Sequence, residues 1–209
     1  METATRRGRA PRYAPDEERT RILEAAMQVL RGNQFVDAPI AEILDAAGLS
    51  TRAFYRHYKS KDELLLALHL RDTELLAQLL ERRVTAAQSP ADGLRAWVSE
   101  LLKVSTDRRR SERAALLGSE AVRRMQGFAE QTIHAWNLAG QSLRVVLEAG
   151  QADGSFASVD PARDTELIQA MVWPHVTQHP GSPAATVDHV VAFCLRALGA
   201  STDVTDSTG

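Results

Sequence analysis

Residues 40–70 read IAEILDAAGLSTRAFYRHYKSKDELLLALHL, and the first half of this stretch predicts two short helices joined by a tight turn. Apolar residues recur every three to four positions from Ile40 to Ala47, as one buried helical face requires. Gly48 stands where a residue of left-handed conformation would end that helix, and Ser50 is suited to cap the next one. The stretch therefore predicts a helix-turn-helix.

The second helix of this pair, from Thr51 to about Tyr58, is two turns long and rich in hydrogen-bond donors. It is too short and too polar to serve mainly as core. Directly after it, Ser60 and Glu63 form a capping box, in which hydroxyl and carboxylate would each bind a backbone N–H left unpaired at a helix start. A long helix is therefore expected to begin at Lys61.

This order of elements resembles the DNA-binding domain of the TetR family of bacterial transcriptional regulators. Residues 46–65, AAGLSTRAFYRHYKSKDELL, carry most of the resemblance: an Ala-Gly-aliphatic-Ser turn, a Tyr-x-His-aromatic run and a Lys-acid-x-Leu helix start. The resemblance implies an all-α fold of about nine helices. An N-terminal helix-turn-helix DNA-binding domain would precede a C-terminal helical domain for ligand binding and dimerisation.

Composition limits the class of protein. The chain has 209 residues and 44% hydrophobic content, which is ordinary for a globular protein. The single cysteine, Cys194, excludes an internal disulfide framework and a cysteine-only zinc site. No apolar run approaches the ~18 residues of a membrane span, and the N-terminus lacks the apolar core of a signal peptide. We expect a cytoplasmic protein with no membrane partner.

Charge is unevenly distributed along the chain. The net charge is −2, yet residues 1–61 hold 11 Lys and Arg against 8 Asp and Glu. The positive excess thus lies in the predicted DNA-binding end, as attraction to phosphates requires. Four arginines also stand in the first 14 residues, at 6, 7, 9 and 12. They form either a flexible arm that follows the minor groove or a solvated tail, and the sequence favours neither.

The helical pattern continues through the chain and sets the expected domains. These are a basic flexible arm over 1–14, the helix-turn-helix domain over 15–60, the effector-binding and dimerisation domain over 61–199, and a disordered tail over 200–209. Helices are expected at about 16–30, 40–47, 51–58, 61–87, from 90, 111–118, 120–149, from 160 and 187–198. Pro174 should kink the eighth helix or end it early.

The resemblance assigns DNA contact to Ser50, Thr51, Arg52, Ala53, Tyr55, Arg56, His57 and Lys61. The first residues of a recognition helix reach base edges, and an arginine fork such as that of Arg52 suits guanine O6 and N7. Tyr55 matches a position that touches backbone or a thymine methyl, and Arg56 could meet a base or a phosphate. His57 and Lys61 match phosphate-binding positions. Ser50 is either an N-cap or a phosphate contact.

Two features of the helix-turn-helix depart from the family pattern. Relatives often begin the first helix of the pair with threonines that bind phosphate, whereas Ala38-Pro39-Ile40 stands there. Ala41 occupies a position that is often basic. That helix should therefore contribute mainly the backbone N–H groups of its N-terminus. The side chains of Phe54 and Tyr58 are expected in the core.

The effector and the dimer are also implied by the resemblance. Candidate residues lining an effector pocket are Trp97, Met125, Phe128, Trp136 and Trp173. For any single one of them ordinary core is the favoured interpretation, because apolar residues at helical spacing are the default interior. As a group they suggest an apolar or aromatic small molecule. The last two helices would pair with their symmetry mates, and the homodimer would bind double-stranded DNA at a palindromic operator.

No pattern in the sequence favours an enzyme. There is no nucleophile elbow, P-loop or dinucleotide fingerprint, and no cofactor is expected. His175 and His179 have a metal-ligand spacing, but the prolines at 174 and 180 and the lack of a nearby third ligand argue against a metal. The arginines at 108–110 are expected on a solvated surface. The prediction is a ligand-responsive repressor; the alternative is a helical small-molecule-binding or oligomeric protein with a vestigial DNA-binding head.

Overall fold

A computed structural model describes residues 13–31, 39–107, 110–111, 120–177 and 184–200 of the chain. The chain divides into two compact units, residues 1–68 and 69–209. Within the described ranges the regular elements are helices, and the one isolated bridge pairs Phe156 with Ala200. The predicted all-α architecture is confirmed. The basic arm, the expected helix at 111–118 and His179 fall almost entirely outside the described residues.

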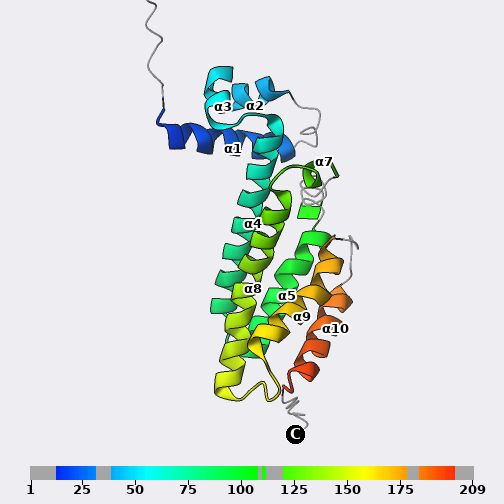
Figure 1. Cartoon of the computed structure of the whole chain (residues 1–209). Helices are drawn as coiled ribbons and strands as arrows, with labels where there is room; N and C mark the ends of the chain where they lie inside the picture. The colour runs from blue at the N-terminus through cyan, green and yellow to red at the C-terminus, as the bar shows by residue number, and fades with distance from the viewer. Residues whose placement is uncertain (1–12, 32–38, 108–109, 112–119, 178–183, 201–209) are drawn as a thin grey trace, which may run out of the picture. The chain divides into compact units, whose positions relative to one another are not determined.

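The first unit contains α1 (Pro15–Arg31), α2 (Ile40–Ala47), α3 (Thr51–His57) and the start of α4 (Lys61–Thr85). Helix α1 packs against both α2 and α3 (Figure 1). Apolar residues recur every three or four positions along each helix, and the stripes that they form supply the core. Ile22, Ile43 and Phe54 are fully buried in it. Tyr58 is buried as well, so both aromatic residues expected in the core lie there.

The turn between α2 and α3 is built as the sequence predicts. Gly48 caps α2 with φ 66°, a left-handed conformation that costs glycine little. Its N–H binds the carbonyl of Asp45 at 3.1 Å, and that of Leu49 binds the carbonyl of Leu44 at 2.9 Å. The hydroxyl of Ser50 then accepts the N–H of Ala53 at 3.3 Å. Ser50 is thus an N-cap of α3.

The capping box at the start of α4 is also present. The hydroxyl of Ser60 accepts the N–H of Glu63 at 3.2 Å. The Glu63 carboxylate reaches back to the N–H of Lys59 at 2.6 Å. Two unpaired backbone donors are satisfied in this way, so α4 begins at Lys61 as expected.

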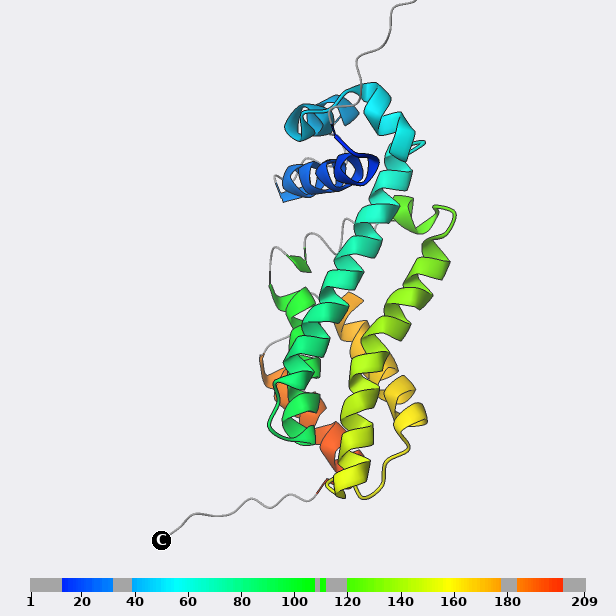
Figure 2. The same ribbon diagram turned by 90° about the vertical axis from the view of Figure 1, so that its left-hand side faces the viewer.

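The second unit contains the rest of α4 together with α5 (Pro90–Thr106), α7 (Glu120–Arg123), α8 (Phe128–Asp153), α9 (Pro161–Thr177) and α10 (Ala184–Ala197). Helix α5 packs against α8, α9 and α10, and α8 also packs against α9 (Figure 2). Leu94, Trp97 and Leu101 of α5 are almost fully buried in the resulting core, beside Leu143 and Val191. Helix α5 is therefore the central element of this unit.

The prediction of a single helix over 120–149 is wrong, because the helix is interrupted at Gly127. That residue has φ 89°, a left-handed conformation, and separates the short α7 from α8. The N–H of Phe128 binds the carbonyl of Met125 at 3.2 Å across the break. A glycine inside an apolar pattern was compatible with a continuous helix, and only the backbone angle decides between the two.

The end of α8 was also predicted four residues too early. Gly150 remains helical and buried, because the ring of Phe156 lies where a β-carbon would stand, 2.2 Å from the nearest ring atom. Gly154, with φ 77°, caps the helix instead. Phe156 pairs with Ala200, and the N–H of Ser158 binds the carbonyl of Leu198 at 3.0 Å. Ala200 is therefore part of the fold and not the first residue of a tail.

Pro174 lies inside α9, which continues to Thr177, so it does not end the helix. The first compact unit also extends to Leu68, beyond the expected boundary at residue 60, and its last residues include the buried Leu64, Leu65 and Leu68 of α4. No helix among the described residues is both long and apolar enough to cross a membrane.

Candidate nucleic-acid interface

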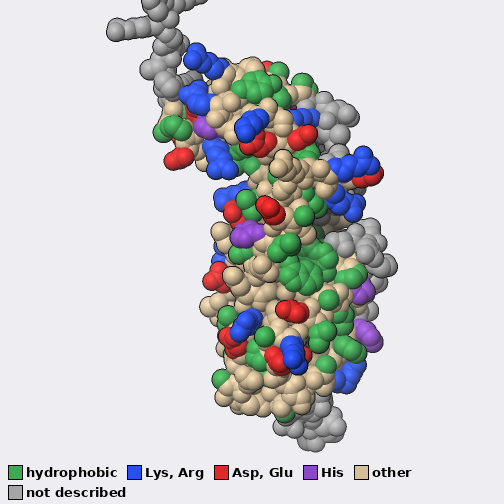
Figure 3. Space-filling view, in the orientation of Figure 1, with side chains coloured by type: hydrophobic (Ala, Val, Ile, Leu, Met, Phe, Trp, Pro, Cys, Tyr) green, Lys and Arg blue, Asp and Glu red, His purple; other side chains and the backbone are tan. Residues whose placement is uncertain are grey.

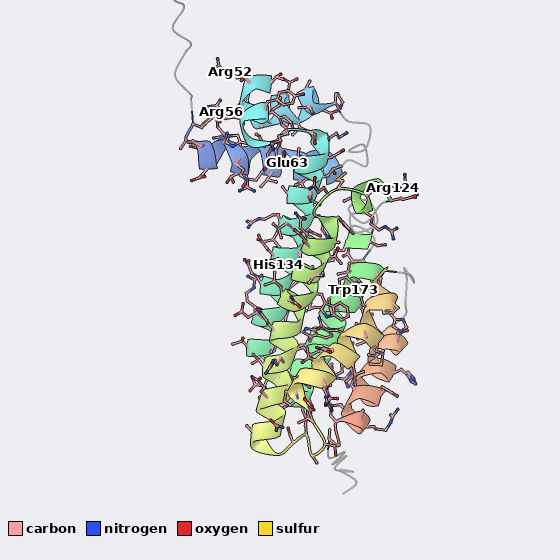
Figure 4. All side chains as sticks on the ribbon, viewed as in Figure 1. Arg52, Arg56, Glu63, Arg124, His134 and Trp173 are labelled. Atoms are coloured by element: carbon pink, nitrogen blue, oxygen red, sulfur yellow. The ribbon has the colours of Figure 1, made fainter. Side chains whose placement is uncertain are left out.

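Helix α3 has one buried and one exposed face. Ala53 and Phe54 are buried, whereas Thr51, Arg52, Tyr55 and Arg56 are exposed. The exposed residues stand at positions i, i+1, i+4 and i+5, which lie on one side of a helix. Figure 4 shows Arg52 and Arg56 extending from the same side of α3. On this face of the first unit basic side chains stand beside hydrophobic ones (Figure 3).

Tyr55 is the large apolar residue on that face, with 57% of its surface exposed. Its ring packs edge to face on Phe54, with centroids 5.3 Å apart. Such a contact restricts the side chain while more than half of its surface remains exposed. An ordered, exposed tyrosine beside two arginines is suited to bind an anionic, partly apolar surface.

Arg56 and His57, at the end of α3, both contact Glu18 of α1. Nε2 of His57 lies 2.9 Å from Oε2 of Glu18, and Nη2 of Arg56 lies 3.6 Å from Oε1. The Glu18 side chain is only 3% exposed, while that of Arg56 is 41% exposed. A buried carboxylate requires such partners, because unpaired burial of a charge is costly.

His57 lies in a different place from that expected of a phosphate-binding residue. Its side chain is 10% exposed, and one ring nitrogen already binds Glu18. A neutral imidazole that donates from Nε2 has no proton on Nδ1 and can only accept there. A phosphate, which needs donors, would therefore require the imidazolium form. The imidazole is an internal link between α1 and α3.

The other residues assigned to DNA contact are divided between surface and core. Ser50 is exposed, and its hydroxyl caps α3, as one of the two readings expected. Lys61 is half-buried at the start of α4. Ala53 is 3% exposed and packs inside the unit, so it offers DNA no surface in this conformation. Its burial follows from its position beside Phe54 on the inner side of α3.

Helix α2 has exposed residues but no basic side chain among them. Pro39 precedes it without a side-chain cap, and the N–H of Glu42 binds the Pro39 carbonyl at 3.1 Å. Ala41 is exposed. The first turn of α2 thus presents backbone N–H groups and one acid, and the basic side chains of this face come from α3.

Electrostatics in the first unit follow burial. Burial raises the pKa of Tyr58, while the neighbouring Arg19 acts in the opposite direction. No acid stands in the first turn of α3, and its last turn carries Arg56 and His57. Arg56 and His57 therefore stand at the negative end of the helix dipole, where a cation is favourable.

The aromatic residues proposed to line an effector pocket do not form one group in the second unit. Trp97 is fully buried, and its indole N–H donates to the carbonyl of Ala139 at 2.9 Å, so it is a core residue. Trp136 and Trp173 are half-buried and meet edge to face, with centroids 5.5 Å apart. Phe128 lies 5.2 Å from the ring of His69, whose pKa is lowered by burial. Met125 is half-buried in the turn before α8.

A groove of about 520 Å³ lies between α4 and α8 in the second unit. It is lined by Glu74, Ala77, Gln78, Glu81, His134, Leu138, Gln141, Ser142 and Val145. None of the five predicted pocket residues is among these. In the described part of the chain no three His, Cys, Asp or Glu side chains are grouped to hold a metal ion.

Glu18 and Gln169 are among the buried polar residues that sequence reasoning missed. Glu18 shares the inward face of α1 with Ile22 and Ala25, four and seven residues later, and an acid in that register was the available signal. Gln169 of α9 is buried and donates to the carbonyl of Trp136 at 2.8 Å. It fits because Gly140 lacks a β-carbon, which would stand 2.6 Å from the Gln169 Oε1.

Comparison with known proteins gives one match to the helix-turn-helix region and further matches to most of the chain. Residues 22–68 match the family model described as bacterial regulatory proteins, tetR family. The HTH-type transcriptional activator FasR of Mycolicibacterium smegmatis is 34% identical over 123 residues, which are 54% of this chain and 48% of that protein. The match thus spans about half the length of that relative.

Solved structures match over most of the chain. A regulatory protein of the tetR family from Rhodococcus RHA1 has a TM-score of 0.60 at 22% identity, covering 88% of this chain and 98% of its own. A TetR-family regulator from Mesorhizobium loti has a TM-score of 0.70 at 16% identity, with 89% and 96% covered. At these identities the likeness is one of fold.

Proposed function

We propose that the chain is a member of the TetR family of bacterial regulatory proteins and a ligand-responsive transcriptional regulator that binds operator DNA through α3. The observation that carries the proposal is the exposed face of α3, where Thr51, Arg52, Tyr55 and Arg56 stand together without an acid in the first turn. A solvated helix face has no need of an ordered exposed tyrosine between two arginines.

The residues of this face have different roles in the proposed complex. Arg52, near the N-terminus of α3, would reach base edges in the major groove, where its fork suits guanine. Tyr55 and Arg56 stand about one turn further along. Lys61 would bind a phosphate, which adds affinity and register but no sequence information. Ser50 acts as the cap that starts the helix.

A symmetric dimer would place two such helices on successive turns of the major groove. The half-sites would then lie about 34–36 Å apart, and the operator would be a palindrome or close to one. Two features of the exposed surface support an association of copies through the last helices: Leu167 of α9 and Phe193 of α10 are large hydrophobic residues with at least half of their surface exposed.

The effector is proposed to be a small apolar or aromatic molecule held in the second unit. The half-buried edge-to-face pair of Trp136 and Trp173 supports this, because such rings can repack around an aromatic guest. Trp97 is excluded from the proposed lining, since it is committed to the core. We propose that the protein represses transcription and that the effector releases it from DNA. The 34% identical relative is named an activator, and the reporter assay described below distinguishes repression from activation.

A gel-shift assay tests the DNA-binding proposal. The purified protein is mixed with the upstream region of its own gene and with a scrambled duplex, each at two salt concentrations. We expect a specific band that weakens as salt increases, because phosphate contacts release counterions. If no specific band forms at low salt, the proposal of a DNA-binding regulator is overturned, and the alternative of a protein with a vestigial DNA-binding domain is favoured.

A thermal-shift screen of apolar and aromatic compounds tests the effector proposal. A ligand present at 100 times its dissociation constant adds about 2.7 kcal/mol to the free energy of unfolding. A reporter gene placed behind the bound upstream region gives the sign of regulation, and loss of repression on adding the stabilising compound is expected. Activation of the reporter by the bound protein would contradict the proposal of repression but not the proposal of DNA binding.

A further inference from the structure

Glu18 is placed where it can control the end of α3 that carries Arg56. It lies in the first turn of α1 with a side chain 3% exposed, and each of its two oxygens faces a different residue of α3. The contacts join residues 38 and 39 positions apart in the chain, so they fix one helix against the other. Helix α3 is two turns long.

The two contacts of Glu18 differ in kind. The bond to His57 is short, at 2.9 Å, and lies inside the unit. The pair with Arg56 is longer, at 3.6 Å, and reaches a guanidinium that is 41% exposed. An arginine has five N–H donors in a planar fork, and the 3.6 Å contact of Nη2 with Glu18 is an ion pair and not a hydrogen bond. The exposed part of the Arg56 guanidinium can therefore still donate to DNA.

This arrangement orders a long side chain before any ligand arrives. A free arginine on a surface samples many rotamers, and fixing them on binding reduces affinity. The buried carboxylate holds the guanidinium on one side while the other faces solvent. A site supported in this way by a buried neighbour keeps the geometry that recognition requires.

We propose that Glu18 is a positioning residue for operator recognition, which binds His57 to set α3 against α1 and holds Arg56 ready at the DNA-facing surface. The proposal rests on the proposed function and adds a residue outside the helix-turn-helix to it. His57 acts from inside the unit and does not bind phosphate. Loss of Glu18 then lowers the preference for operator over other DNA.

A purely structural role for Glu18 leads to a different result. If the carboxylate only stabilised the first unit, its loss would reduce the fraction of folded protein. Affinity for operator and for random DNA would then fall by the same factor, and their ratio would not change. The ratio of the two affinities therefore separates positioning from stability.

The test compares Glu18→Gln with Glu17→Gln. Both changes remove one negative charge from neighbouring positions of α1, but the Glu17 side chain is 51% exposed and pairs only with Arg21 among the described contacts. The probes are a duplex enriched by the wild-type protein from a randomised pool and a scrambled duplex of equal length. Thermal unfolding of each variant checks that it is folded.

We expect Glu18→Gln to lower the ratio of operator to scrambled affinity about tenfold relative to Glu17→Gln, the size of one charge-assisted contact. Arg56→Ala should lower it as well, and the double variant should lose less than the sum of the two single losses, because the two changes share the contact between Glu18 and Arg56. His57→Gln, which keeps a donor for Glu18, should retain the ratio better than His57→Ala.

Three results would count against these expectations. If folded Glu18→Gln keeps the wild-type ratio of operator to scrambled affinity, the positioning role of Glu18 is overturned and the proposed function stays intact. Additive losses in the double variant overturn the link through Arg56. Failure of the wild-type protein to enrich any duplex overturns the proposed function itself, and with it the role of Glu18.

Discussion

The indole N–H of Trp97 in α5 donates a hydrogen bond to the backbone carbonyl of Ala139 in α8, over 2.9 Å. The donor is fully buried, and the acceptor belongs to the neighbouring helix of the same core. A buried indole N–H without a partner would be costly, so this bond is part of what allows a tryptophan at the centre of the unit. Trp97 therefore stabilises the helix pair and is not free to meet an effector.

Trp97→Phe should destabilise the protein. The change removes the N–H donor and part of the ring volume, and we expect a loss of about 1–3 kcal/mol in the free energy of unfolding. Denaturant titration measures it. Trp136→Phe is the matched control, because Trp136 is half-buried and its loss should cost less. Equal losses for the two variants would contradict a special role of the Trp97 bond.

Arg52→Ala should relax sequence preference. If Arg52 reads guanine through its fork, the variant loses about 1–3 kcal/mol of discrimination at one base pair of each half-site. Binding to a set of duplexes with single base-pair changes measures this. A variant that keeps the preference at every position would show that Arg52 does not read a base.

Lys61→Ala should weaken binding to all sequences alike. A phosphate contact carries no sequence information, so specific and random duplexes should lose affinity by a similar factor, and the slope of log affinity against log salt should decrease by about one. Titrations at four or more salt concentrations give the slope. An unchanged slope, or a loss confined to the operator, would show that Lys61 has another role.

Glu100→Gln should change how stability depends on pH. Glu100 is buried in α5 and accepts from Lys103 at 2.6 Å, with Arg83 at 3.3 Å and Arg110 at 3.5 Å. Burial alone would raise the pKa of its carboxyl, but the three cations together outweigh burial and lower the pKa below 4.5. The folded state therefore favours the charged form, and its stabilising effect is present above about pH 4.5 and lost as pH falls further.

Wild-type protein should therefore lose more stability than Glu100→Gln when pH is lowered from about 6 to about 3.5, as measured by thermal unfolding. The effect will be moderate, since the side chains of Arg83 and Lys103 are at least half exposed and screened by water. Glu148→Gln, which breaks an exposed pair with Arg144, should lose as much thermal stability as the wild type over the same pH range. Parallel curves for wild type and Glu100→Gln would refute the stabilising role of this carboxylate.

Cys194 should be unreactive in the folded protein. Its side chain is buried in α10, and burial raises the pKa of the thiol to about 11. Because the thiolate is the reactive form, a thiol reagent at about pH 8 should label the protein slowly under native conditions and fully after unfolding. Rapid native labelling would mean that α10 opens readily.

Gly150→Ala should destabilise the second unit although alanine favours helices. The added β-carbon would stand 2.2 Å from the ring of the buried Phe156, so the ring or the helix must move. Overpacking of this kind costs about 1–3 kcal/mol, against a gain in helix propensity of about 1 kcal/mol. The double variant with Phe156→Leu should recover part of the loss. Unfolding measurements on both variants provide the check.

The helix-turn-helix could be predicted in detail from the sequence because its signals are local. Gly48, Ser50, Ser60 and Glu63 act through backbone groups no more than four residues away, so their roles can be read from spacing alone. The exposed residues of α3 follow from the helical period for the same reason. The break at Gly127 was missed, since glycine is compatible with a helix and with a left-handed turn.

The sequence by itself therefore determined the fold class, the resemblance to the TetR family, the capped helices of the first unit and the candidate recognition face of α3. Tertiary structure alone decided which side chains from distant parts of the chain meet. Glu18 turns His57 inward, Phe156 keeps Gly150 in its helix, and Trp97 is committed to the core. The physical reason is range: caps and helical periods act within a few residues, whereas the burial and pairing of a side chain depend on packing between helices.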